Sequence, residues 1–196
     1  MNDDDERRAG YLRLAMVAPA DRPPLVAPLD EPVGFEDAAD RPDLARRLHR
    51  VLAFDFAHLP EIADLWVESW ARTLPAIDFE ARRVWFCTHV DEALRKGAKI
   101  RVALVETGDV VGFVLIDPAT GYLDQIAVHP DLWGEGIAEA LLDAARALSP
   151  ARIRLDVNTD NPRAVAFYLR EGFREIGRGV NPRSGLATIA LEWRPG

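Results

Sequence analysis

One segment constrains the fold more than any other: a strand, a short loop and a helix follow each other within residues 124–148. Residues 126–128 are apolar and typical of a strand, and a stripe with the 3.6-residue period of a helix follows from Ile137. Gly134 and Gly136 are expected in the first turn of that helix. Backbone N–H groups that converge there, reinforced by the helix dipole, can hold an anion. By itself this pattern is also typical of dinucleotide folds and of ordinary tight turns.

Strand and helix patterns alternate from residue 49 onward in the order β-α-α-β-β-β-α-β-α-β-β. The expected strands are residues 49–56, 100–106, 110–116, 122–128, 153–157, 173–179 and 186–193, and the expected helices are residues 60–75, 79–96, 134–148 and 162–171. No internal repeat is present. This order predicts an α/β (α+β) domain with a mixed sheet and helices on its faces.

The N-terminal part differs from the rest. Six of the fourteen prolines fall within residues 1–46, among acidic residues and without sustained periodicity. Such a stretch predicts an extended or partly disordered arm, with a short amphipathic piece at residues 11–17. Residues 47–196 are then the folded domain.

Composition excludes several classes of protein. A net charge of −8 argues against nucleic-acid binding, which needs a basic face. The single cysteine, Cys87, permits no intrachain disulfide and is interpreted as a buried structural thiol. No apolar run approaches the ~20 residues of a membrane span, and the acidic N-terminus is unlike a targeting peptide, so no membrane association and a cytoplasmic location are expected. No His, Cys and Asp cluster has metal-ligand spacing, so no metal is predicted.

A second segment allows Gly134 and Gly136 to be interpreted. The run from Asn161 to Phe173, Asn-Pro-Arg-Ala-Val-Ala-Phe-Tyr-Leu-Arg-Glu-Gly-Phe, follows about 25 residues later. Together the two segments resemble the GCN5-related N-acetyltransferase (GNAT) superfamily. Its Arg/Gln-x-x-Gly-x-Gly/Ala motif matches Trp133 to Ala138, except that Trp133 stands where Arg or Gln is usual. The N-x-x-A-x-x-x-Y-x-x-x-G-F segment matches throughout.

The resemblance implies an acetyl-coenzyme A site and a mostly antiparallel GNAT-type sheet whose central strands splay apart at a bulge. Pantetheine would lie along the backbone of Ile126, Ala127 and Val128. The remaining implied cofactor contacts are the backbone amides of Gly134, Glu135, Gly136, Ile137 and Ala138, which would hold the pyrophosphate, with Trp133 beside them. The departure at Trp133 removes a side-chain contact but leaves the amides in place.

Asn161 and Tyr168 each have two interpretations. Asn161 is a helix N-cap before Pro162, and in the resembling family it also contacts the pantetheine arm. Tyr168 lies about two turns later on the same face. A tyrosine there is ordinarily a core residue, whereas in this family it donates a proton to the departing CoA thiolate.

The general base is open at this stage. Amine acetylation needs an acceptor for the amine proton, and Asp124, on the expected fourth strand, is the first candidate. Glu68 and His129 are the others. A strand-end N–H, that of Val128, would polarise the thioester oxygen. The family attacks directly, without an acyl-enzyme.

The acceptor is predicted to be an amine bound by residues 62–96 and the loop 181–185, with its identity unknown and a homodimer left open. The main alternative is a non-catalytic acyl-CoA-binding or sensor domain. A nucleotide-binding or redox domain is disfavoured by the motif order, because G-x-G-x-x-G is incomplete and no P-loop occurs.

Overall fold

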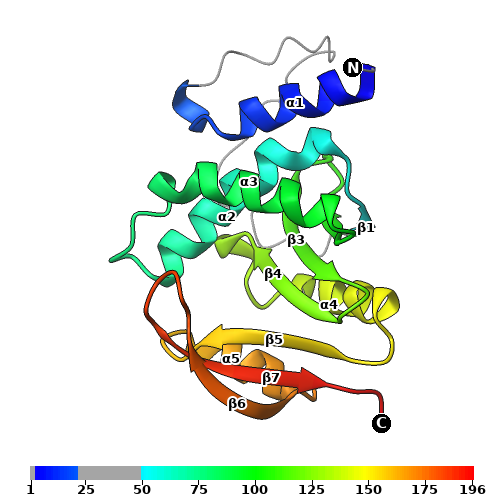
Figure 1. Cartoon of the computed structure of the whole chain (residues 1–196), viewed down its shortest axis with the longest axis vertical. Coiled ribbons are helices and arrows are strands. Elements are labelled where there is room, and N and C mark those ends of the chain that lie inside the picture. The colour runs from blue at the N-terminus through cyan, green and yellow to red at the C-terminus, as the bar shows by residue number, and fades with distance from the viewer. Residues whose placement is uncertain (1–2, 22–49) are drawn as a thin grey trace.

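The computed structural model describes residues 3–21 and 50–196 (Figure 1). The strands are β1 Arg50–Ala53, β2 Lys99–Leu104, β3 Val110–Asp117, β4 Tyr122–Val128, β5 Ile153–Asn158, β6 Arg174–Val180 and β7 Ala187–Trp193. The α-helices are α1 Asp3–Ala15, α2 Leu59–Thr73, α3 Arg83–Arg95, α4 Ile137–Leu148 and α5 Pro162–Arg170. Short 3-10 turns lie at η1 Pro19–Asp21, η3 Phe56–His58, η4 Glu80–Arg82 and η5 Pro130–Leu132. The predicted order of elements from residue 50 onward is confirmed, with ends shifted by a few residues.

The strands of the described chain form one sheet in the order β1-β2-β3-β4-β5-β7-β6. Neighbouring strands are antiparallel except β4 and β5, which run parallel. The predicted mixed, mostly antiparallel sheet is therefore confirmed. The parallel pair stands at the centre, which is where the predicted strand–loop–helix unit crosses between the two halves of the sheet.

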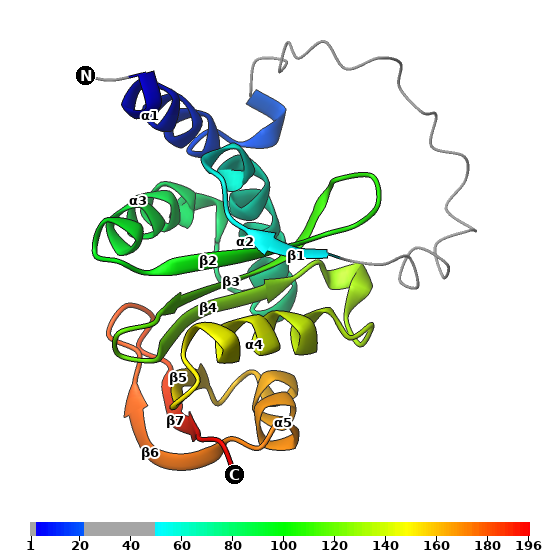
Figure 2. The same ribbon diagram turned by 90° about the vertical axis from the view of Figure 1, so that its right-hand side faces the viewer.

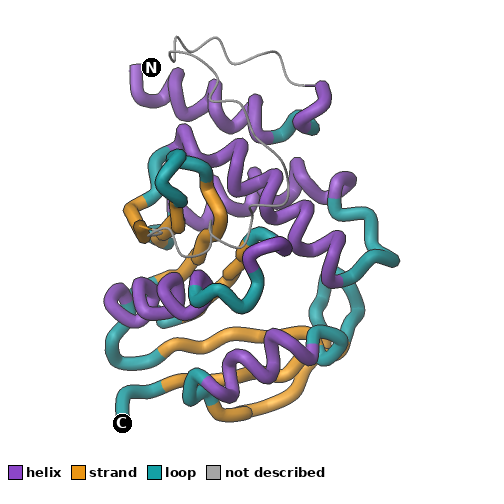
Figure 3. Tube along the Cα trace, turned by 180° about the vertical axis from the view of Figure 1, so that it is seen from behind, coloured by secondary structure: helices purple, strands orange, loops and turns teal. Residues whose placement is uncertain are grey.

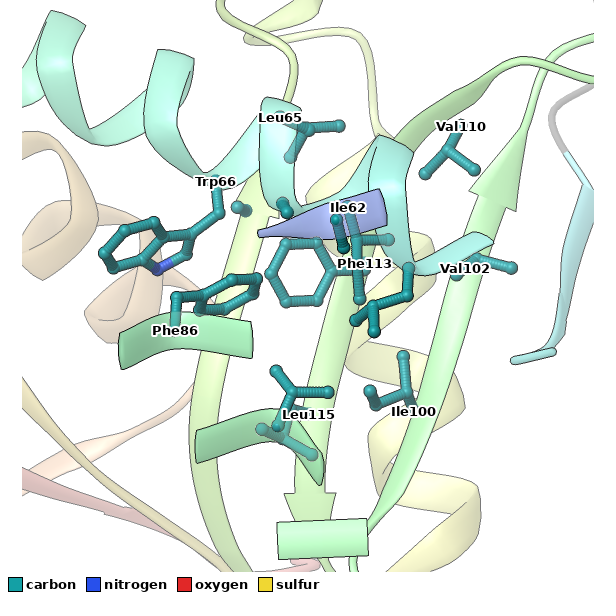
Figure 4. Close-up of a cluster of buried hydrophobic side chains, with 14 of the residues drawn as sticks. Ile62, Leu65, Trp66, Phe86, Ile100, Val102, Val110, Phe113 and Leu115 are labelled. Atoms are coloured by element: carbon teal, nitrogen blue, oxygen red, sulfur yellow. The ribbon is translucent and has the colours of Figure 1, made fainter. Parts of the chain in front are cut away.

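Helices cover both faces of this sheet, as predicted. α2 and α3 lie on one face, and α4 and α5 lie on the other (Figure 2). On the α2–α3 side, Ile62, Trp66 and Phe86 pack on the strand residues Phe113 and Leu115 (Figure 4). Cys87 is fully buried in the same cluster, which agrees with a structural thiol.

The N-terminal residues correct one expectation. Residues 3–15 form the helix α1 rather than an extended arm, and α1 lies against the outer side of α2 and α3 (Figures 1 and 3). The prolines begin only at Pro19, acidic residues occupy the first turn of α1, and Arg13 lies in its last turn, all of which favour a helix. The remainder of the predicted arm, residues 22–46, lies outside the described residues, and so does residue 47 where the domain was predicted to begin.

Helix α4 begins three residues later than predicted. Gly134 and Gly136 have φ values of 91° and 82°, so neither can be part of a right-handed helix. Gly136 is instead the residue that precedes the first helical position, Ile137. The glycines therefore shape the turn that enters the helix.

Candidate active site

A cleft of about 710 Å³ runs across the centre of the molecule. Its walls come from the start of α4, the facing sides of β4 and β5, the helix α5, and the helices α2 and α3 with the β6–β7 loop. These are the two regions that the sequence assigns to cofactor and acceptor. The structure brings them together in one continuous cavity.

The cleft exists because β4 and β5 diverge. Both strands are fully described, and their one register pair is Tyr122 with Arg154. On the other side of β4, Leu123 and Gln125 face consecutive residues of β3, so Asp124 is the extra residue of a β-bulge. The bulge bends β4 away from β5, which confirms the splayed central strands.

The backbone of β4 beyond the bulge points alternately to its two neighbours. The His129 N–H donates to the Val111 carbonyl at 2.9 Å, which fixes the alternation along the β3–β4 ladder. Ala127 therefore directs its N–H and C=O toward β3. Ile126 and Val128 direct theirs toward the gap beside β5. Of the three predicted pantetheine contacts, Ile126 and Val128 have the appropriate orientation.

The turn between β4 and α4 is where the sequence predicts an anion cradle. Gly134 and Ala138 line the cleft, and a Cβ atom placed on Gly134 or Gly136 would meet no heavy atom within 4 Å. Glu135 is exposed, and its side chain does not line the cleft. The Ile137 side chain is buried in the core under α4. Any contribution from these last two residues is thus confined to their amides.

Trp133 has a structural task and a cationic neighbour. Its indole N–H donates to the Val128 carbonyl at 2.9 Å, which ties the turn to the end of β4. The guanidinium carbon of Arg163, from α5, lies 3.0 Å from the centroid of the Trp133 ring. Both side chains line the cleft. Arg163 thereby brings a positive charge to the position where Trp133 replaces the usual Arg or Gln.

Asn161 and Tyr168 lie at opposite ends of α5 and both line the cleft. The Asn161 side chain accepts from the Ala164 N–H at 3.1 Å, so its predicted capping role is confirmed. Tyr168 is only 5% exposed and packs against Phe167 and Phe173. Burial raises the pKa of the Tyr168 phenol well above its ordinary value, so the group keeps its proton.

A histidine that the sequence analysis did not select completes the site. His89, on α3, places Nε2 2.5 Å from a carboxylate oxygen of Asp124. The other Asp124 oxygen accepts from the Gln125 side chain at 3.1 Å, and Gln125 in turn accepts from the Trp66 indole N–H at 3.0 Å. Because the carboxylate can only accept, the Nε2 atom is the donor to Asp124.

His89 could not be singled out from its position in the chain. It lies 35 residues from Asp124, and the two meet only because α3 packs over β4. One feature of the sequence could have pointed to His89: it follows Trp85 by four residues, so both lie on one side of a helix. In the structure the two rings stack with their centroids 5.0 Å apart.

The other two candidate bases lie elsewhere. Glu68 and His129 pair with each other, with 3.4 Å between Oε2 and Nε2. Neither lines the cleft. His129 Nδ1 also accepts from the Asp131 N–H at 3.3 Å, which agrees with a role in the turn.

A smaller cavity of about 190 Å³ lies behind the His89–Asp124 pair. Its walls include His89, Asp124, Glu92, Lys96 and Asp117. The pair therefore lies between the main cleft and a second, smaller cavity. Among the described residues no group of three or more potential ligands is arranged to hold a metal ion. None of the helices in residues 3–21 and 50–196 is long and apolar enough to cross a bilayer.

The splayed parallel strand pair, the glycine turn before α4 and the buried Tyr168 lie around one cleft, which is the arrangement that the resemblance implies. The acetyltransferase (GNAT) family model matches residues 59–173, which is more than half of the chain. The chain therefore belongs to the acetyltransferase (GNAT) family. This confirms the resemblance and the predicted class of enzyme, with acetyl-CoA as the cosubstrate.

Two relatives are similar in sequence. The peptidyl-lysine N-acetyltransferase YjaB of Salmonella typhimurium is 37% identical over 82 residues, which are 41% of this chain and 54% of that protein. The protein of the same name from Escherichia coli is 29% identical over 121 residues, or 60% of this chain and 77% of that protein. The chain thus matches about half the length of the Salmonella relative.

The fold is also similar to a solved structure. The solution structure of the apo form of YjaB from Escherichia coli gives a TM-score of 0.58 at 24% identity, covering 74% of this chain and 97% of that chain. At this identity the likeness supports the fold alone.

Proposed function

We propose that this chain transfers an acetyl group from acetyl-CoA to the side-chain amine of a lysine in a peptide or protein. The observation that carries the proposal is the single cleft in which the β4–β5 gap, Tyr168 and the His89–Asp124 pair meet. The lysine acceptor rests on the two relatives named as peptidyl-lysine N-acetyltransferases.

His89 is the general base of this proposal. Near neutral pH a lysine amine is almost wholly protonated, so a group in the cleft must take its proton before attack. Imidazole is the side chain best suited to exchange a proton at that pH. Asp124 positions the ring through Nε2 and favours the imidazolium that forms, which leaves Nδ1 to accept the proton.

The remaining steps fall to β4 and α5. As the amine nitrogen bonds to the thioester carbon, negative charge develops on the carbonyl oxygen, and the Val128 N–H is oriented to stabilise it. The carbon–sulfur bond then breaks, the electron pair stays on sulfur, and the second proton of the attacking nitrogen passes to that sulfur, so that the products are the amide and CoA. The Tyr168 hydroxyl donates a hydrogen bond to that sulfur.

Arg163 and the amides of Gly134, Glu135, Gly136, Ile137 and Ala138 are proposed to hold the pyrophosphate. Asn161, with the backbone of Ile126 and Val128, would contact the pantetheine arm, and Ala127 would contribute only by keeping β4 in register with β3. Support comes from the open space at the glycines and from the position of Arg163 over Trp133.

Mass spectrometry of a lysine peptide incubated with the protein and acetyl-CoA tests the activity. The expected result is one added acetyl group on the lysine, with an equal amount of free CoA. His89→Gln and Asp124→Asn should each lower kcat, and rate at pH 7 should recover partly at higher pH, where free amine is more abundant. His58→Gln is the matched control, because His58 caps a 3-10 turn outside the cleft.

A protein that binds acetyl-CoA yet acetylates no amine in a broad library would instead be a non-catalytic acyl-CoA-binding domain. A loss of activity in His129→Gln that exceeds the loss in His89→Gln would assign the base to the other histidine.

A further inference from the structure

Two arginine side chains lie on aromatic rings at the acceptor end of the cleft. The Arg183 guanidinium carbon, from the β6–β7 loop, is 3.8 Å from the centroid of Trp85. The Arg82 guanidinium carbon, from the turn before α3, is 5.4 Å from the centroid of Phe79. Both arginines and both rings line the cavity. A guanidinium stacked in this way keeps its N–H edge available for an anion.

Neither arginine forms an ion pair with a described residue, although carboxylates are abundant in this chain of net charge −8. The neighbouring Arg83, by contrast, bonds to both Asp64 and Glu80 at 2.6 Å. Among the described residues, Arg82 and Arg183 thus face the cleft without an acidic partner, whereas the adjacent Arg83 has two.

The carboxylates of the cleft are already engaged. Asp124 bonds to His89, Glu139 bonds to Arg170 at 3.0 Å, and Asp156 accepts from Tyr122 at 3.1 Å. The cavity is lined by four arginines against these three acidic side chains, which leaves an excess of one positive charge with His89 neutral. An acidic protein thus presents a locally cationic cleft.

The distance between Arg183 and the proposed base, His89, suits a lysine that has a carboxylate on a neighbouring residue. Because Trp85 contacts both groups, the Arg183 guanidinium carbon lies no more than 8.8 Å from the His89 ring centroid, the sum of 3.8 and 5.0 Å. An extended lysine side chain spans about 6 Å from Cα to Nζ. A carboxylate on an adjacent residue can therefore reach Arg183 while the amine meets His89.

We propose that the acceptor is a lysine flanked by acidic residues, whose carboxylates bind to Arg183 and Arg82. This inference rests on the proposed lysine acetylation and names the sequence context of the lysine. A polyamine or a lysine in a basic segment is disfavoured, because the two guanidiniums repel additional cations.

Three peptides of equal length test the inference, each with one central lysine flanked by glutamate, glutamine or arginine. The glutamate peptide should have the highest kcat/KM, about 10- to 100-fold above the glutamine peptide, because hydrogen bonds to charged groups have that effect. The arginine peptide should be the poorest. Equal values, or a preference for the arginine peptide or for spermidine, would overturn the inference.

Substitutions connect the preference to the two side chains. Arg183→Gln and Arg82→Gln should each lower the ratio of kcat/KM for the glutamate peptide to kcat/KM for the glutamine peptide. Arg183→Glu should favour the arginine peptide. Arg178→Gln is the control, since Arg178 pairs with Glu175 on β6 outside the cleft. An undiminished preference in both Gln variants would contradict the assignment.

Fluorescence anisotropy of the labelled peptides separates this inference from the proposed function. If the glutamate peptide binds more tightly and this depends on Arg183, the inference is supported even when no peptide is acetylated. The lack of acetylation then counts against the proposed function alone. Acetylation of all three peptides with equal affinity supports the acetylation and rejects the acidic context.

Discussion

Burial gives Tyr168 a definite chemical character. The phenol is held protonated because its surroundings disfavour the anion. A thiol ordinarily has a pKa near ~8.5, well below that of such a phenol, so complete proton transfer to the thiolate is unfavourable. A strong hydrogen bond that stabilises the developing charge is the better description of its role.

Tyr168→Phe tests this role with little disturbance of packing, since the ring is retained. We expect kcat to fall by about 10²-fold or more, in the range typical of lost general-acid or oxyanion-type groups, with the affinity for CoA nearly unchanged. Steady-state kinetics and calorimetry with CoA measure the two quantities. An unchanged kcat would remove Tyr168 from the mechanism.

Arg163 is a second residue whose substitution should affect the binding of acetyl-CoA separately from kcat. Arg163→Ala should raise the KM for acetyl-CoA by about tenfold, as expected for the loss of a charge-assisted contact, without lowering kcat. The same variant should use S-acetylpantetheine, which lacks the pyrophosphate, as well as the unchanged protein does. An equal loss with both donors would show that Arg163 supports the fold of the turn and not the pyrophosphate.

At the scale of elements, the glycine turn before α4 is the segment proposed to hold the pyrophosphate. Gly136 and Gly108, in the β2–β3 turn, form a matched pair: their φ values are 82° and 92°, and both would have open space around a Cβ atom. Gly136→Ala and Gly108→Ala should each cost roughly 1 kcal/mol of unfolding free energy, because alanine is strained at positive φ.

The two variants should differ in acetyl-CoA binding. Gly136→Ala is expected to weaken binding, since the added methyl group and the shifted amides disturb the anion cradle, whereas Gly108→Ala should bind acetyl-CoA normally. Urea denaturation and calorimetry give the two measurements. Normal binding by Gly136→Ala would place the pyrophosphate elsewhere.

Elements were easier to predict than contacts between them. Periodicity located most strands and helices, and the run from Asn161 to Phe173 indicated the family, because both signals are local. The start of α4 was wrong by three residues, since the helical pattern extends over glycines whose positive φ excludes them from the helix. The His89–Asp124 pair and the arginines on aromatic rings depend on how distant elements pack, so no local pattern indicates them.

At the scale of the whole molecule, α1 is fastened to the helix that carries His89. Asp91 on α3 bonds to Arg8 of α1 at 2.6 Å and to Arg95 at 2.8 Å, with its side chain 11% exposed. Burial opposes ionisation of Asp91, but the hydrogen bonds from Arg95 and Arg8 outweigh it and hold the pKa of this carboxyl below its usual range.

Asp91→Asn should therefore destabilise the protein by about 1–3 kcal/mol at pH 7. Because the folded pKa is lowered, this contribution is fully present above the unfolded pKa of ~3.9 and is lost as pH falls through the lower folded value. Asp143→Asn, which breaks a pair at an Asp143 side chain that is 69% exposed, is the control and should cost less than about 1 kcal/mol. Equal stability of Asp91→Asn and the unchanged protein across pH 3–7 would show that α1 docks without this pair.

A single-turnover experiment with acetyl-labelled acetyl-CoA and a lysine peptide tests the central claim most directly. The account predicts that the label passes to the lysine at the same rate as CoA appears, and that no label is found on the protein at any time, because the amine attacks the thioester in the cleft and the one cysteine is buried. A labelled protein that forms without peptide and then donates its acetyl group, or release of CoA with no acetylated peptide, would contradict it.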